Sequence, residues 1–220
     1  MKIAALVTAV VAAALAFAFR AHLAGTPTMW LGVAVPYAAL SALAVYRLYD
    51  DGTLLDAFKI RAGDVTLGVL TAGLIYAGAW AFERFFISAS APRLAWLFRM
   101  AVQIGAGRPS PIYLGLIIIG LAVAEELVWR GMVLGALAES FGTRRAAPFA
   151  ALAYALAHVP SMFTLADPDV GPNPLLVVAA FGCGLVWSFT ATLAGRLPPV
   201  IISHAVFSYF AIELLLPKLA

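Results

Sequence analysis

Long apolar runs separated by short polar breaks are the feature that most restricts how this chain can fold. Hydrophobic residues make up 64% of the 220-residue sequence and charged residues only 11%, whereas soluble domains carry about 25% charged residues. A helix that crosses a bilayer needs about 20 mostly apolar residues. The sequence therefore predicts an integral membrane protein and argues against a soluble enzyme. The runs that approach this length are Ile3–Phe19, Met29–Tyr46, Val65–Phe82, Ile112–Leu137, Ala146–Pro160, Pro174–Ala194 and Pro199–Leu216.

Two other segments separate these runs. The segment Asp50–Asp64 carries several aspartates and basic residues, which is typical of a solvated loop. The segment Pro92–Gly105 mixes two arginines with large apolar side chains, a pattern typical of a helix that lies in the membrane interface. We expect an all-α polytopic transmembrane bundle of about seven spans, or about eight if the interfacial segment also crosses.

Charge and cysteine content restrict the partners. The net charge is +3, and the basic residues are scattered between the runs rather than gathered, so we expect no nucleic acid partner. The one cysteine, Cys183, lies in an apolar run and is expected to be a small packing residue. The composition is rich in alanine, leucine and arginine, which favours a multi-pass protein of a bacterial inner membrane. The lipid bilayer is then an obligatory partner.

Three charged residues lie inside the apolar run Ile112–Ala138, namely Glu125, Glu126 and Arg130. A charge near the bilayer centre costs about 2.5–3.5 kcal/mol on insertion scales, so such residues are rare unless they have a function. On a helix Glu126 and Arg130 share one face and can pair, whereas Glu125 projects about 100° away. A structural ion pair and a functional pair are both compatible with this spacing. Glu125 is left free to act as a general base.

Two later spans also carry ionisable groups. His158 follows Tyr154 by one helical turn, and Ser208 follows His204 by one turn, so each neighbour can orient or bond the imidazole. Either histidine alone, like Tyr154, can equally be a residue of the packed core. Polar groups at membrane depth on several spans are best satisfied in one shared interior cavity. The ionisable residues of the predicted spans are Glu125, Glu126, Arg130, His158, His204 and Glu213, of which Glu213 is expected near the interface.

Two hydrolytic schemes use these groups. In one, His158, His204 and a glutamate bind Zn²⁺, which activates water. In the other, Glu125 and His158 polarise water directly, and His204 with Ser208 stabilises the oxyanion. The sequence has no His-Glu-x-x-His motif, so the common one-helix zinc site is absent. The choice between the schemes, and hence any metal, stays open.

The stretches Glu125-Glu126-x-x-x-Arg130-Gly131, Tyr154-x-x-x-His158 and His204-x-x-x-Ser208 resemble the three signature motifs of the CPBP family. That family contains CAAX prenyl endopeptidases together with bacteriocin-processing and immunity-type proteins, often described as intramembrane metalloproteases. The resemblance covers roughly Ile112–Phe210 and implies a catalytic helical core over residues 112–216. The apolar runs before it place N-terminal transmembrane helices and the interfacial segment in residues 1–111.

The resemblance also implies roles for single residues. Glu125 is the carboxylate that activates water, and His158 is its partner. Glu126 and Arg130 support the site, and His204 contacts the oxyanion or a metal. Two positions depart from the family pattern: Tyr154 stands where phenylalanine is usual, and Ser208 stands where asparagine is common. The loss of a good oxyanion donor can cost about 10²–10³ in turnover.

The sequence thus predicts an intramembrane endopeptidase that cuts a membrane-associated peptide or protein tail. Two alternatives remain. A proton-coupled transporter would also use intramembrane glutamate, histidine and arginine, although we find no repeated halves. A non-catalytic scaffold or immunity protein would retain a degenerate site, of which Ser208 would be the mark.

Overall fold

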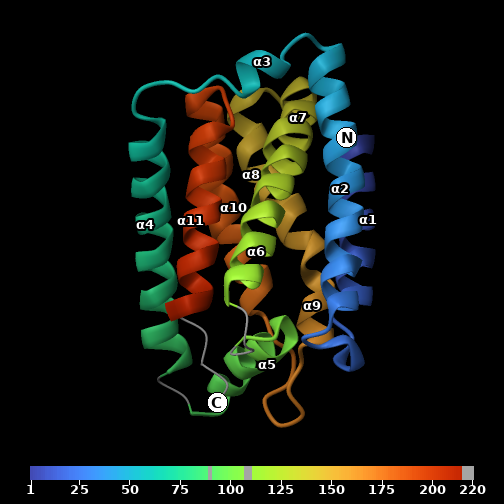
Figure 1. The fold of residues 1–220 in the computed structure, drawn as a ribbon, viewed down its shortest axis with the longest axis vertical. Coiled ribbons are helices and arrows are strands. Elements are labelled where there is room, and N and C mark those ends of the chain that lie inside the picture. The colour runs from blue at the N-terminus through green and yellow to red at the C-terminus, as the bar shows by residue number, and fades with distance from the viewer. Residues whose placement is uncertain (89–90, 107–110, 215–220) are drawn as a thin grey trace.

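A computed structural model gives the fold and describes residues 1–88, 91–106 and 111–214. Nearly all of these residues are helical, and the described part of the chain contains no β-strand, only one antiparallel bridge between Asp167 and Gly171. The long helices run side by side in one bundle, with α5 at one end and α3 at the other (Figure 1). In chain order the α-helices are α1 Lys2–Ala18, α2 Pro27–Asp50, α3 Leu54–Ala57, α4 Asp64–Phe82, α5 Leu94–Ile104, α6 Pro111–Glu126, α7 Leu134–Phe141, α8 Thr143–Ala157, α9 Val159–Thr164, α10 Leu175–Ala194 and α11 Pro198–Leu214.

Short non-α turns extend or precede some of these helices. They are η1 Ala21–Leu23, η2 Glu83–Ile87, η3 Ala91–Arg93 and η4 Leu127–Val133. The turns η2 and η4 are π-helical, and η4 joins α6 directly to α7.

The all-helical class is confirmed, but the number of spans is only partly supported. Within the described ranges, four helical segments are long and apolar enough to cross a membrane: Pro27–Asp50, Asp64–Ile87, Thr143–Thr164 and Leu175–Ala194. Lys2–Ala18 and Pro198–Ile212 are apolar but shorter. The expected seven to eight spans are therefore not confirmed. The predicted interfacial segment forms the eleven-residue α5, which is too short to cross.

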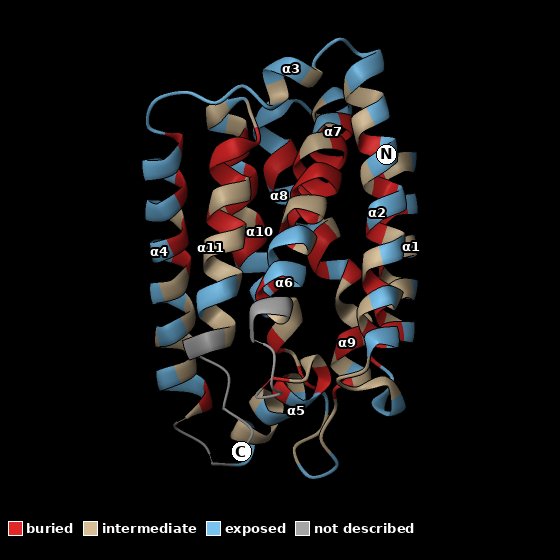
Figure 2. Cartoon of the chain, viewed as in Figure 1, coloured by how far each residue is buried: buried red, intermediate tan, exposed pale blue. Residues whose placement is uncertain are grey.

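The outward faces of the bundle are apolar, as a bilayer requires. Figure 2 shows exposed residues along the outer sides of α2 and α4, whereas buried residues face inward. Among the exposed side chains are Leu31 and Val35 of α2 and Leu70 and Leu74 of α4. Large apolar side chains exposed in this number mark a membrane-facing surface rather than an aqueous one. The inward face repeats at helical spacing, as in Val7, Val11 and Leu15 of α1.

Several local features fix how the helices sit. Thr26 caps α2, because its side-chain oxygen accepts a hydrogen bond from the Met29 N–H at 3.3 Å. A Cβ atom at Gly68 would lie 2.7 Å from Ile202 and so could not be accommodated, which shows how closely α4 approaches α11. Arg196, in the turn between α10 and α11, pairs with Asp64 at the start of α4. These contacts hold α4 against α11, which carries the second histidine.

The loop 165–174 holds α5 in place at the end of the bundle. The Trp96 indole N–H donates to the Gly171 carbonyl at 3.3 Å, and Asn173 donates to the Trp96 carbonyl at 3.0 Å. Arg99 lies 3.5 Å from the carboxylate of Asp167. The loop and α5 therefore form one unit below the long helices. The side chain of Glu213, predicted near the interface, lies outside the described residues.

Candidate active site

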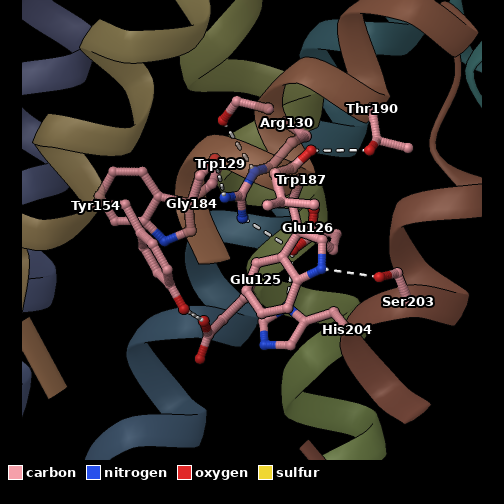
Figure 3. Close-up of polar contacts among 12 residues, drawn as sticks. Glu125, Glu126, Trp129, Arg130, Tyr154, Gly184, Trp187, Thr190, Ser203 and His204 are labelled. Carbon is pink, nitrogen blue, oxygen red and sulfur yellow. Dashed lines mark hydrogen bonds and ion pairs between the residues drawn. The ribbon is translucent and has the colours of Figure 1, made fainter. Parts of the chain in front are cut away.

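Three segments far apart in the sequence bring their polar side chains to one buried point, shown in Figure 3. Glu125 and Glu126 end α6, and Arg130 lies in the following turn η4. Tyr154 comes from α8 and His204 from α11. All five are buried, and the Glu126 side chain has no exposed surface. The structure thus brings the two glutamates, Arg130 and His204 together at one buried point, as expected for a shared interior site.

The predicted pair of Glu126 and Arg130 is present. Nη1 of Arg130 lies 2.9 Å from Oε1 of Glu126, and both side chains are buried. The other nitrogens of the guanidinium donate to the Gly184 carbonyl at 3.2 Å and, through Nε, to the Ser188 hydroxyl at 3.4 Å. The rings of Tyr154 and Trp187 also lie against the guanidinium, at 5.1 and 5.3 Å. This many partners is what a buried cation needs to be tolerated.

The histidine of α11 is bonded through the same carboxylate. Nδ1 of His204 lies 2.7 Å from Oε1 of Glu126, so one carboxylate oxygen serves both His204 and Arg130. The described residues give Oε2 of Glu126 no hydrogen-bond partner. Because a carboxylate only accepts, Nδ1 of His204 carries a proton, and Nε2 is the nitrogen left for chemistry.

The sequence prediction that Ser208 bonds His204 is not what the structure shows. Within the described residues, no hydrogen bond joins Ser208 to His204. The imidazole is bonded instead to the Glu126 carboxylate, which comes from another helix. Trp187, which the sequence did not single out, packs on the imidazole instead, and Ser203 is bonded to Trp187. The Trp187 ring stacks on the His204 ring at 3.8 Å, and the Trp187 N–H donates to the Ser203 hydroxyl at 3.0 Å. A buried tryptophan in an apolar span looks like packing, so the sequence held no signal for it.

Tyr154 connects the second motif to the first. Its hydroxyl donates to Oε2 of Glu125, and its backbone carbonyl accepts from Nδ1 of His158 at 2.8 Å. The rings of Tyr154 and His158 meet edge to face, with centroids 4.7 Å apart. His158 follows the last residue of α8 and is half-buried. Because its Nδ1 donates to the carbonyl, its Nε2 carries the lone pair. The prediction that Tyr154 orients the imidazole holds for its backbone, whereas its side chain is bonded to Glu125.

Small residues and a further tyrosine support this arrangement. A Cβ atom at Gly184 would lie 3.2 Å from Ala151 and 3.3 Å from Tyr154, so this glycine allows α10 to approach α8 closely. The Tyr37 hydroxyl from α2 accepts the Trp129 indole N–H at 3.1 Å, and both side chains are fully buried. Cys183 is a buried free thiol, as expected of a packing residue.

Ser208 lines a cavity beside the site. The cavity has a volume of about 560 Å³ and is bounded by residues of α4, α5, α10 and α11. Its walls are almost entirely apolar, and its polar lining groups include Ser208, Glu83 and Gln103. Gly182 forms part of the wall, and a Cβ atom there would meet nothing within 4 Å. The cavity can therefore take an apolar chain next to the histidine-bearing helix.

The side chains of the site can be compared with the ligands that a zinc ion requires. A structural or catalytic zinc site needs three or four ligand atoms at about 2.0–2.3 Å from one point. No three His, Cys, Asp or Glu side chains form such a group in the ranges 1–88, 91–106 and 111–214. Nδ1 of His204 and Nδ1 of His158 are bonded within the protein, which leaves Nε2 of each ring as the nitrogen available to a metal. Because no such group of three forms within those ranges, the side chains as placed do not fit a zinc ion.

Comparison with known proteins supports the motif assignment. The family model described as type II CAAX prenyl endopeptidase, Rce1-like, matches residues 107–210. No curated protein and no solved structure matches the chain significantly. The matched range contains all three motifs, and it confirms the family expected from them.

Proposed function

Through residues 107–210 this chain belongs to the Rce1-like family of type II CAAX prenyl endopeptidases, and we propose that it is an intramembrane endopeptidase. Its substrate is a membrane-associated peptide or protein tail, and it works in a bacterial inner membrane. One observation carries this proposal: the motifs of α6, α8 and α11 meet at one buried site. A peptidase needs a base, a positioned water and an oxyanion donor, and these groups can supply each of them.

Glu125 and His158 are the water-activating pair in this proposal. Oε2 of Glu125 is bonded to Tyr154, which leaves Oε1 as the free basic oxygen. His158 has its Nδ1 on a carbonyl, so Nε2 presents a lone pair to the same water. Glu125 takes one proton from the water as the water oxygen attacks the scissile carbonyl carbon. The same proton then passes to the departing amine nitrogen, which returns Glu125 to the carboxylate.

His204 is the oxyanion donor. For Nε2 to donate, the ring must carry a proton on both nitrogens in the reacting state, and the Glu126 carboxylate lies 2.7 Å from Nδ1. Glu126 is in turn fixed by Arg130. The carboxylate orients the ring and balances its charge, as the aspartate does in a serine protease triad. Removal of one oxyanion donor typically costs about 10²–10³ in kcat.

The cavity of about 560 Å³ gives the apolar part of the substrate a place to bind. Its wall includes Ser208 on α11, one turn beyond His204, so a chain held there lies next to the proposed oxyanion donor. We assign Ser208 to contact with the bound substrate. A bacteriocin leader, a C-terminal sorting segment or the tail of another small membrane protein all have the required apolar character.

The test is cleavage of membrane-tethered reporter peptides by the purified protein in proteoliposomes. The Glu125→Gln and His204→Ala variants are compared with wild type, with and without a zinc chelator. Glu139→Gln is a matched control, because it makes the same chemical change on the exposed side of α7. We expect cleavage by wild type and the control only. Full activity of folded Glu125→Gln would contradict the assigned base, and proton flux without cleavage would favour a transporter.

A further inference from the structure

Tyr154 carries a hydroxyl at a position where the family pattern usually has phenylalanine, and that hydroxyl is bonded to Glu125. We propose that Tyr154 is a positioning residue that holds Oε2 of Glu125, so that Oε1 is the oxygen presented to the water. This inference rests on the proposed peptidase function and adds a residue specific to this chain. Tyr154 acts through Glu125 rather than on the substrate.

The Tyr154 ring is held on several sides, which fixes where its hydroxyl points. Its neighbours are the Trp129 ring, edge to face at 5.1 Å, the His158 ring at 4.7 Å and the Arg130 guanidinium at 5.1 Å. The absent side chain of Gly184 leaves the space that the ring fills. Figure 3 shows the hydroxyl directed at the Glu125 carboxylate. A donor fixed in this way needs no reorganisation when the reaction begins.

The hydroxyl has no structural need to be there. Phenylalanine would make the same ring contacts, and a buried hydroxyl is costly unless it is hydrogen-bonded. Tyr154 and Glu125 are both buried, so their bond is shielded from water. A bond between a neutral donor and a carboxylate is also about twice as strong as one between neutral groups. A carboxylate with one oxygen held in this way cannot rotate freely about its terminal torsion.

The main test is Tyr154→Phe, with Tyr37→Phe as the matched control. Both changes remove one buried phenolic oxygen near the same cluster, but Tyr37 bonds to Trp129 rather than to Glu125. We expect Tyr154→Phe to lower kcat about 10- to 100-fold with KM within about twofold, because a lost hydrogen bond to a charged group acts on the base and not on binding. Tyr37→Phe lowers the Tm through the unpaired Trp129 N–H but lowers kcat far less than Tyr154→Phe does, because the bond between Tyr154 and Glu125 stays in place.

A double-mutant cycle separates positioning from packing. If Tyr154 acts only through Glu125, Tyr154→Phe costs under about twofold in a Glu125→Asp background, where the shorter side chain no longer reaches the hydroxyl. An equal loss in both backgrounds would overturn the proposal. So would an unchanged kcat for Tyr154→Phe in the wild-type background.

A second readout does not depend on peptidase activity. A hydrophobic carbodiimide modifies buried carboxyl groups, and mass spectrometry of the peptide that contains Glu125 gives its rate. We expect Tyr154→Phe to speed the labelling of Glu125 by about threefold or more, since one oxygen loses its partner, whereas Tyr37→Phe leaves it unchanged. Equal rates in wild type and Tyr154→Phe would refute the bond itself. Faster labelling in a protein that cleaves nothing would instead place the failure in the proposed function.

Discussion

Substitution of Arg130 tests how much the buried pair of Glu126 and Arg130 contributes to the stability of the fold. Arg130→Met keeps most of the volume but removes the charge that neutralises Glu126. Oε2 of Glu126 has no partner among the described residues, so Oε1 and its bond to His204 become the only compensation there. Breaking a buried pair by removing one partner costs about 3–5 kcal/mol. For a chain of this size that lowers the Tm by about 6–20 °C.

The double variant Glu126→Gln/Arg130→Met tests the cause of that loss. It removes both charges, and the side-chain amide oxygen that it introduces in place of the carboxylate can still accept from His204. Because replacing both members of a buried pair is often close to neutral, we expect stability to return to within about 1–2 kcal/mol of wild type. Activity does not return, since the imidazolium has lost its counter-charge.

Denaturation with SDS in mixed micelles, followed by tryptophan fluorescence, measures both variants. Trp129 and Trp187 lie next to the pair, so their emission reports its surroundings. Two results would refute the reasoning: a single variant within about 1 kcal/mol of wild type, or a double variant as unstable as the single one.

Three further predictions concern the cavity and the loop. Gly182→Leu adds a side chain at the cavity wall, where a Cβ atom would meet nothing within 4 Å, and should raise KM about tenfold at unchanged Tm. Gly184→Ala, whose Cβ would lie 3.2 Å from α8, should instead lower the Tm. Ser208→Asn should raise kcat in the peptide cleavage assay at least severalfold, because its longer amide donor, one turn beyond His204, can reach the oxyanion of the bound substrate. The pKa of Asp167 is held below its ordinary value of 3.8, chiefly by the backbone N–H of Asp169. The ionised Asp167 therefore contributes its full stabilisation above about pH 4, and this contribution is lost as the pH falls through the lower pKa of the folded state. On acidification from about pH 5 to about pH 3, the Tm of Asp167→Asn should change less than the Tm of wild type.

Helix positions were the part of the fold most open to prediction. The run Val65–Phe82 became α4 Asp64–Phe82, and Pro199–Leu216 corresponds to α11 Pro198–Leu214 over the described residues. Such runs are predictable because a membrane helix is defined by local composition. The number of crossings was less predictable. The length of an apolar run sets whether it can span, but several helices here fall short of the usual length.

The site could be predicted only where its contacts are local. The pair Glu126–Arg130 follows from a spacing of four residues on one helix. The contact of Glu126 with His204 joins residues 78 positions apart, and helix spacing alone pointed to Ser208 instead. The same holds for the stack of Trp187 on His204, which depends on how α10 packs on α11. Such pairings are set by tertiary packing, which a single sequence does not encode in any local pattern.

The π-helical turn η4 determines which changes of length the continuous helical segment of α6, η4 and α7 can accept. A π turn accommodates an extra residue within an otherwise α-helical segment. Because the wide turn absorbs that residue locally, removal of one residue from Leu127–Val133 would restore a regular helix and leave the face that α7 presents to α8 nearly unchanged relative to α6. A deletion between Glu126 and Arg130 would, however, change their spacing of four residues and so break their buried pair. The packing of α7 therefore tolerates a change of length here that the ion pair of the active site does not.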